Sequence, residues 1–91
     1  MRVQVIVHPL FQPLTDGQET VEVEGRKVKE CLAALVRRYP TMKEALFDRR
    51  GGLRNWVEIY CNDKSTYPEE LDYAVADGDQ LRIIPVAIGG G

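Results

Sequence analysis

The chain has 91 residues and a mass of 10.3 kDa, enough for one domain with a single modest core and too little for a two-domain enzyme. Hydrophobic residues make up 44% and charged residues 29%, which are ordinary proportions for a folded globular protein. The longest apolar runs cover only a few residues, far fewer than the roughly 20 needed to cross a bilayer, and no export signal follows Met1. The sequence therefore predicts a cytoplasmic protein with no membrane segment.

Charge is distributed unevenly along the chain. The net charge of −2 argues against nucleic-acid binding. Residues 26–54 nevertheless carry nine basic and three acidic side chains, whereas the rest of the chain carries three basic and eleven acidic ones. This bipolar pattern indicates either solvated surfaces of opposite sign or a surface that selects a protein partner by charge.

The first part of the chain predicts a β-hairpin. β-Branched residues alternate with polar ones over residues 2–10 and again over residues 20–24. Pro9 and Pro13 interrupt the connection between them, and Asp16-Gly17 favours a turn.

The middle of the chain predicts one main helix. After Gly25 the apolar residues recur at helical spacing and form the stripe Val28, Cys31, Leu32, Leu35, Val36 and Tyr39. Pro40 ends this helix, and Thr41 is positioned to cap a shorter one over residues 42–47.

The last part predicts two further strands, over residues 55–62 and 80–86, the second preceded by the turn Asp77-Gly78-Asp79. Residues 65–73 are irregular and indicate a short edge strand or a helical turn. The order of elements predicts an α+β fold, a mixed sheet of four or five strands with one main helix across one face. A helix between the second and third strands allows a parallel pairing in that sheet.

Few side chains in the sequence could carry catalysis. His8 is the only histidine, and with Cys31 and Cys61 it lacks the close spacing of a metal site. Both cysteines fall on apolar faces, where they usually serve as small buried hydrophobes, so we interpret them as reduced thiols. The sequence therefore predicts no bound metal or cofactor and no enzyme activity.

The C-terminus ends in three glycines, which add nothing to a core or a helix. Residues 86–91 would extend about 20 Å at the usual rise of roughly 3.3 Å per residue. A glycine end fits a narrow channel and leaves the terminal carbonyl open to a nucleophile, because it carries no side chain. The alternative is a frayed end or the remainder of a tag.

These features together resemble the ubiquitin-like sulfur carriers, a family that includes the small subunit of molybdopterin synthase and the thiamine-thiazole sulfur carrier. The resemblance covers nearly the whole chain. It rests on the hairpin, the amphipathic helix, the Ile59 to Asp63 segment, the Asp77-Gly78-Asp79 turn, the apolar strand with Pro85 and the terminal glycines. The long segment over residues 48–56 is most similar to the branch that supplies sulfur for cysteine biosynthesis. The resemblance implies a ubiquitin-like β-grasp domain over residues 1–86 and a flexible glycine-rich tail over residues 87–91.

The resemblance also implies a function for the terminal carboxylate. An adenylating enzyme related to the ubiquitin activators would join Gly91 to AMP, with ATP and magnesium bound by that partner, and a sulfur donor would then form a thiocarboxylate. The chain would be a carrier without catalytic activity or cofactor of its own. Its sulfur would pass to a synthase that makes cysteine, molybdopterin or a related product. The sulfur donor and a C-terminal processing protease are further candidate partners.

The implied site combines the chain end with a docking surface. Gly91 would be the adenylate and thiocarboxylate acceptor, with Gly90 beside it. We expect the docking surface on the sheet face opposite the helix and in the adjacent loop, at Ile6, Trp56, Tyr60, Ile84, Leu10, Phe11 and Leu14. The residues expected to bind the partner are Phe11, Leu14, Ile84, Val86, Ile88 and Gly89.

Two other functions are open at this point. The chain is either a ubiquitin-like modifier conjugated through Gly91 to lysines of target proteins, or a β-grasp interaction module with an incidental glycine end. One departure from the family pattern concerns the tail. Six residues with three glycines follow Pro85, whereas the family tail usually has five residues and ends in two glycines.

Overall fold

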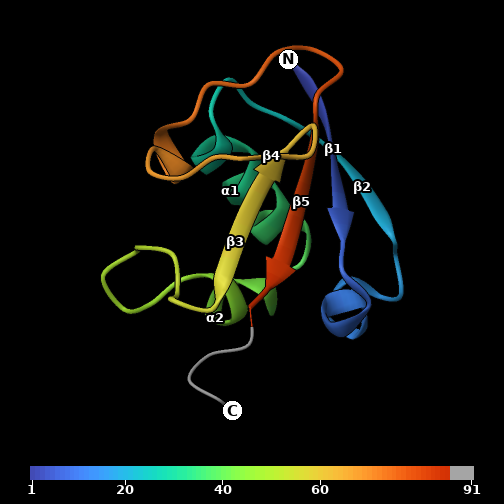
Figure 1. Cartoon of the computed structure of the whole chain (residues 1–91). Helices are drawn as coiled ribbons and strands as arrows, with labels where there is room; N and C mark the ends of the chain where they lie inside the picture. The colour runs from blue at the N-terminus through green and yellow to red at the C-terminus, as the bar shows by residue number, and fades with distance from the viewer. Residues whose placement is uncertain (87–91) are drawn as a thin grey trace.

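A five-stranded mixed sheet carries one main helix across one face (Figure 1). The computed structural model describes residues 1–86. The elements in chain order are β1 (Arg2–Val7), the 3-10 helix η1 (Pro9–Thr15), β2 (Thr20–Glu24), α1 (Val28–Arg38), α2 (Met42–Leu46), β3 (Val57–Cys61), β4 (Lys64–Ser65), the 3-10 helix η2 (Glu70–Asp72) and β5 (Gln80–Pro85). This arrangement confirms the predicted α+β β-grasp fold, with five strands among the described residues.

Strand β5 lies at the centre of the sheet, whose strand order is β2-β1-β5-β3-β4. It pairs in parallel with β1, where Val5 is opposite Leu81, and antiparallel with β3, where Ile59 is opposite Ile83. The parallel pair exists because the chain crosses over through α1 before it returns to the sheet. Strand β5, the last strand within residues 1–86, is thereby held along both of its edges.

The core lies between α1 and the inner face of the sheet. Alternate residues of the three central strands point toward α1, as the sequence pattern predicts, and α1 meets them with its apolar stripe. The core side chains of these elements, each at most 4% exposed, are Val3, Val5, Val7, Val57, Ile59, Cys61, Leu81, Ile83, Val28, Cys31, Leu32 and Leu35.

The second helix starts without the predicted cap. Thr41 stands directly before α2, but its side chain makes no capping hydrogen bond. Its hydroxyl instead donates to the carbonyl of Leu14 at 3.1 Å and so links α2 to η1. No helix among residues 1–86 is both long enough and apolar enough to cross a membrane.

The connection between β1 and β2 folds as the 3-10 helix η1, which the sequence analysis did not predict. Pro9 has no backbone N–H for the sheet, so β1 ends at Val7. The Nδ1 atom of His8 accepts a hydrogen bond from the Leu10 amide at 3.0 Å and caps the turn. Phe11 therefore points inward, where its side chain is only 6% exposed. The expectation that Phe11 lies on an exposed docking surface is wrong, because burial of its large ring in the core is favoured.

Two motifs that carried the family resemblance meet at the end of the sheet where β5 begins. The Asp79 carboxylate accepts hydrogen bonds from the Ala76 amide and the Asn62 side-chain amide, each at 2.8 Å. The Asn62 side-chain oxygen in turn accepts from the Gln80 amide at 3.0 Å. The hydrogen bond from Ala76, followed by that from Asn62, lowers the pKa of Asp79. These motifs join the turn after β3 to the start of β5, and this end of the sheet is opposite the C-terminal end (Figure 1).

Truncation of Phe11 tests its place in the core. Phe11→Ala should lower the free energy of unfolding by about 3–5 kcal/mol, because it removes a buried ring and leaves a cavity. Urea unfolding followed by circular dichroism measures this change. Leu10→Ala is the matched control, since the Leu10 side chain is 66% exposed and its loss should change stability by less than about 0.5 kcal/mol. Equal stabilities of the two variants would contradict the buried position of Phe11.

Candidate functional site

Strand β5 ends at Pro85, at the same end of the sheet as α2, η1 and the start of β3 (Figure 1). Pro85 is opposite Val57 in the register of β3 and β5. The Val86 amide donates to the Trp56 carbonyl at 2.7 Å and extends this antiparallel pairing by one residue. We call Val86 and Trp56 the root of the C-terminal segment, because their hydrogen bond fixes where that segment starts.

Arg54 supports the root through its contact with Trp56. The Cζ atom of Arg54 lies 5.2 Å from the centre of the Trp56 ring, within cation–π range. Arg54 Nε donates to the carbonyl of Glu44 at 2.6 Å, and the Arg54 amide donates to the carbonyl of Leu46 at 2.9 Å. The side chain therefore ties α2 to the root. This contact was not predicted from the sequence, where the only signal for it is an arginine two residues before a tryptophan.

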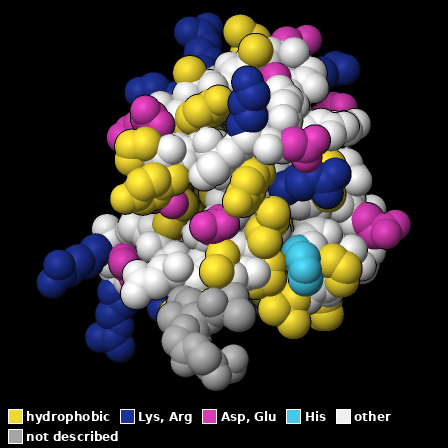
Figure 2. All heavy atoms as spheres, viewed as in Figure 1, with side chains coloured by type: hydrophobic (Ala, Val, Ile, Leu, Met, Phe, Trp, Pro, Cys, Tyr) yellow, Lys and Arg dark blue, Asp and Glu magenta, His cyan; other side chains and the backbone are white. Residues whose placement is uncertain are grey.

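The sheet face opposite α1 carries the predicted apolar side chains. We define the sheet-face patch as Ile6, Trp56, Tyr60 and Ile84, of which Trp56 is 41% exposed and the others are half-buried. Figure 2 shows this face, where apolar side chains alternate with basic and acidic ones. The strand register places Arg82 between Ile6 and Tyr60, and Glu58 accepts a hydrogen bond from the Tyr60 hydroxyl at 3.2 Å. Aromatic side chains such as Trp56 and Tyr60 are enriched at protein interfaces.

The adjoining helix η1 contributes to this surface unequally. Leu10 is 66% exposed, whereas Leu14 is half-buried and packs against the core. A hollow of about 190 Å³ lies where the β1–β5 pair meets the start of η1, and its lining is Ile6, Val7, His8, Pro9, Arg82, Ile83 and Ile84. Leu10, rather than Phe11, is therefore the exposed apolar side chain that η1 offers beside the sheet-face patch.

The remaining predicted site residues fall into two groups. Ile88, Gly89, Gly90 and Gly91 lie outside the described residues, so their roles stay predictions. Ile84 lies in β5 and Val86 directly follows this strand, and both are half-buried. Ile84 therefore lies close to the root, of which Val86 is a part. A partner that contacts this end of the sheet would meet the start of the C-terminal segment and the sheet-face patch together.

Both cysteines are buried free thiols. Burial, assisted by the nearby Glu30 carboxylate, raises the pKa of Cys31 from 9.0 to about 11. Burial also raises the pKa of Cys61 from 9.0 to about 11, assisted by a 3.5 Å contact from its thiol to the Asp79 carboxylate. Because the thiolate is the nucleophile, neither side chain is poised for attack at neutral pH.

Metal ligands are also dispersed in the part of the chain that the structure describes. Within residues 1–86, no three or more His, Cys, Asp or Glu side chains are grouped so that they could hold a metal ion. The His8 Nδ1 atom accepts the hydrogen bond that caps η1. The described residues thus supply a candidate docking face and the root, while the candidate reactive group lies beyond them.

Comparison with known proteins identifies the family. The sequence profile of the ThiS family matches residues 10–90, a range that takes in most of the β-grasp domain and reaches Gly90. The chain belongs to the ThiS family. This membership confirms the resemblance to ubiquitin-like sulfur carriers that the sequence motifs indicated.

Individual relatives of this ThiS-family chain agree with that assignment. Sulfur carrier protein CysO of Mycobacterium tuberculosis is 33% identical, over 99% of this chain and 100% of CysO. A crystal structure of Mycobacterium tuberculosis CysO has a TM-score of 0.86 at 32% identity and covers 93% of this chain and 99% of that one. The similarity to CysO confirms the predicted resemblance to the cysteine-biosynthesis branch.

Two further solved structures extend the comparison. A chain of the Amycolatopsis orientalis BexX/CysO complex has a TM-score of 0.87 at 29% identity and covers 97% of this chain and 99% of that one. SAMP1 from Haloferax volcanii has a TM-score of 0.85 at 25% identity and covers 99% of this chain and 100% of SAMP1. The ThiS-family chain therefore shares its complete β-grasp fold with these proteins.

The two thiols should react slowly in the folded chain. At pH 8 we expect iodoacetamide to modify Cys31 and Cys61 far more slowly than in concentrated guanidinium chloride, because the folded thiols stay protonated and shielded. Mass spectrometry of samples taken over time measures the modification. Equally fast alkylation with and without denaturant would contradict the buried, protonated state of both thiols.

The same pKa shifts predict a pH dependence of stability. The unfolded thiols ionise near 9.0 and the folded ones near 11, so the folded state holds more protons between these values. The stability that these thiols contribute is fully present below pH 9 and is lost as the pH rises through 11. Urea unfolding at several alkaline pH values measures this loss, which should be smaller in Cys61→Ala than in the unsubstituted chain.

Proposed function

We propose that this ThiS-family chain is a sulfur carrier whose terminal carboxylate is converted to a thiocarboxylate. The observation that carries the proposal is the match to the ThiS family over residues 10–90. This range includes both the β-grasp domain and the glycines Gly89 and Gly90 near the end of the chain. The name of the CysO relatives, sulfur carrier protein, supports the same function. The central position of β5 supports it further, because a strand paired on both edges gives the C-terminal segment a fixed starting point.

The proposed reaction has two steps, and both are catalysed by partners. A terminal carboxylate oxygen attacks the α-phosphorus of ATP, pyrophosphate leaves, and an acyl-adenylate forms. A hydrosulfide equivalent from a sulfur donor then attacks the acyl carbon, the bond from that carbon to AMP breaks, and a thiocarboxylate remains. The first step is needed because an ionised carboxylate resists nucleophilic attack, whereas AMP is a good leaving group. ATP and magnesium belong to the adenylating partner, and this chain acts as its co-substrate.

The carrier supplies an unhindered acyl group on a segment of defined reach. Gly91 has no β-carbon, so no side chain blocks the approach of a nucleophile to its carbonyl carbon. Residues 86–91 span about 20 Å when extended, which sets how deep a partner's active site can lie below the root. The burial of both thiols supports the terminus as the group that receives sulfur.

We place the docking of the adenylating partner on the sheet-face patch, with Leu10 beside it. Exposed apolar side chains near the root would hold the domain while the C-terminal segment enters the active site. The BexX/CysO complex of Amycolatopsis orientalis supports a protein partner for this chain as well. A sulfur-accepting synthase is the second expected partner, and the similarity to CysO favours cysteine as the product.

A second candidate function is protein modification through the same carboxylate. SAMP1 of Haloferax volcanii, a small archaeal modifier protein, is 25% identical to this chain. An acyl-adenylate attacked by a lysine amine would give an amide bond to the target protein in place of a thiocarboxylate. Covalent adducts of higher mass in cells that express the chain would favour this function over sulfur transfer.

Sulfur loading tests the role of the terminus directly. Incubation with the cognate adenylating enzyme, magnesium-ATP and sulfide should replace one terminal oxygen by sulfur, a gain of about 16 Da set by the masses of the two atoms. Mass spectrometry should assign this gain to the C-terminal peptide. The Cys31→Ala, Cys61→Ala double variant should load equally well if it remains folded, because the core thiols take no part. A folded cysteine-free variant that accepts no sulfur would contradict the mechanism.

Shortened chains test which terminal glycine the adenylating enzyme accepts as its substrate. Removal of Gly90 and Gly91 together should abolish loading. Removal of Gly91 alone restores the usual family length and ends the chain where the family match ends, so we expect it to load. Circular dichroism is the control that the trimmed domain is still folded. Sulfur delivery that survives removal of all three glycines would overturn the carrier function.

Ile84→Ala tests the docking surface. We expect this change to weaken binding to the adenylating enzyme about ten-fold, as loss of an interface anchor does, with a smaller effect on the melting temperature. Isothermal titration calorimetry measures the dissociation constant. Leu71→Ala is the matched control, because Leu71 is also half-buried against the core but lies in η2, away from the patch. Equal binding by both variants would remove the patch from the docking surface.

A further inference from the structure

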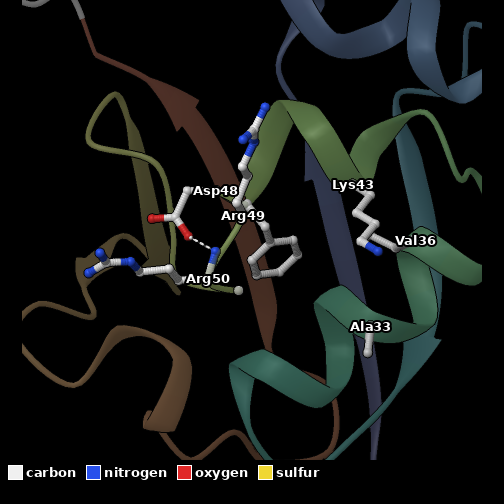
Figure 3. Close-up of a pocket in the computed structure, with 8 residues that line it drawn as sticks. Ala33, Val36, Lys43, Asp48, Arg49 and Arg50 are labelled. Atoms are coloured by element: carbon white, nitrogen blue, oxygen red, sulfur yellow. Dashed lines mark hydrogen bonds between the residues drawn. The ribbon is translucent and has the colours of Figure 1, made fainter.

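A second surface lies on the side of the molecule that carries the helices. A groove of about 500 Å³ runs between α1 and the segment that follows α2, and its lining is Ala33, Val36, Lys43, Phe47, Asp48, Arg49, Arg50 and Gly51. Figure 3 shows Ala33 and Val36 on α1 facing the Asp48 to Arg50 segment across this groove. Phe47 is half-buried and packs against the core, so part of its ring stays available to a ligand. The groove therefore has an apolar base.

The rim of this groove is basic. Lys43 extends toward Val36, whereas Arg49 and Arg50 extend outward from the other wall (Figure 3). Among residues 1–86 none of these three cations forms an ion pair, and the ion pairs of that part of the chain are Arg2–Glu22, Lys29–Asp72 and Arg82–Asp63. The rim thus offers positive charge that the described domain leaves uncompensated.

The one carboxylate in the lining is already engaged. Asp48 Oδ1 accepts hydrogen bonds from the Arg50 amide at 2.8 Å and the Gly52 amide at 3.1 Å. The Asp48 amide also donates to the Gly52 carbonyl at 2.8 Å. These bonds hold Asp48 in the wall of the groove. Against its single negative charge stand the three positive charges of Lys43, Arg49 and Arg50, so the lining keeps a net positive charge.

From this geometry we infer that the groove binds an acidic segment of a partner protein that carries an apolar anchor. The anchor contacts Ala33, Val36 and Phe47, and carboxylates on both sides of it meet Lys43, Arg49 and Arg50. The excess of basic side chains over residues 26–54 attracts such a segment from a distance. A nucleic-acid backbone fits less well, because its phosphates would make no favourable contact with the apolar side chains at the base of the groove.

This surface is separate from the one used in the proposed function. The groove borders α1, and the sheet-face patch lies on the opposite side of the sheet, so one partner on each side can be bound at once. The inference does not rest on the thiocarboxylate mechanism. A chain that lacks residues 89–91 should bind the acidic segment as well as the full chain does, whether or not sulfur loading is confirmed.

The first test uses a fluorescein-labelled peptide in which a Leu-Phe pair is flanked on each side by two Glu residues. Added to the isotope-labelled full chain, it should shift the amide resonances of residues 33–36 and 43–52 and leave those of β1 and β4 unchanged. The same peptide with Lys in place of Glu, and one with Gly in place of Leu-Phe, should both bind at least about ten-fold more weakly. No shift of the groove resonances, or equal binding of all three peptides, would overturn the inference.

Two variants separate the contribution of charge from that of the apolar base. Lys43→Glu with Arg49→Glu should weaken peptide binding at least about ten-fold, because two attractions become repulsions. The matched control is Arg26→Glu with Lys64→Glu, which changes the net charge equally at exposed sites outside the groove. An equal loss of peptide affinity in both double variants would mean that net charge alone explains the effect. That result would overturn the groove as the binding site.

Ala33→Arg tests whether the anchor enters the groove. Ala33 is exposed on α1, and arginine is a good helix former, so the fold should be retained. The substitution adds a positive charge but fills the apolar base, and we expect affinity for the acidic peptide to fall about five-fold or more by steric exclusion. An increase in the affinity of Ala33→Arg for the peptide would overturn the inference. Tighter binding of a single-stranded RNA oligonucleotide than of the peptide by the unsubstituted chain would overturn it as well.

Discussion

The burial of strand β5 between two neighbours is the constraint on which the rest of the structure depends. Parallel pairing with β1 and antiparallel pairing with β3 use both of its edges, and its side chains Leu81 and Ile83 are fully buried. Hydrogen bonds to the Asp79 carboxylate fix the start of β5. The hydrogen bond from the Val86 amide to the Trp56 carbonyl fixes the position where β5 ends. A shift of one residue would turn the buried side chains toward solvent. The domain therefore presents the start of its C-terminal segment at one defined place.

The outer face of the sheet and the helix side of the domain differ in whether their charged side chains are paired. On the outer face of the sheet, Arg82 lies between the apolar side chains and pairs with Asp63 at 3.4 Å, so this cation has a local partner. Around the groove on the helix side, three cations line the wall with one carboxylate, and none of the three is among the ion pairs of residues 1–86. A surface whose charges are paired within the domain is recognised mainly through its apolar side chains. A surface with unpaired cations favours an acidic partner. Three of the nine basic side chains in residues 26–54 thus line this groove.

Most of the fold could be predicted from the sequence, because alternation and helical spacing report directly which residues face a core. Contacts between elements were harder to predict. The Asn62 and Asp79 motifs indicated a family, but nothing in their spacing indicated that they bond to each other. Phe11 was misplaced because a proline-flanked loop has no periodicity from which to infer direction. Arg54 was missed because its role depends on how the segment after α2 returns to the sheet.

The buried thiols and the terminal glycine satisfy one requirement of the proposed chemistry. An acyl-adenylate at the terminus would react with any thiolate within reach, and a thiol of the same chain would capture it as an internal thioester. A rise in pKa from 9.0 to about 11 lowers the thiolate population at neutral pH about a hundred-fold, and burial between α1 and the sheet prevents contact. Sulfur from an external donor then competes with no reactive thiol of Cys31 or Cys61. The packing that stabilises the core would therefore also determine which sulfur atom the terminus receives.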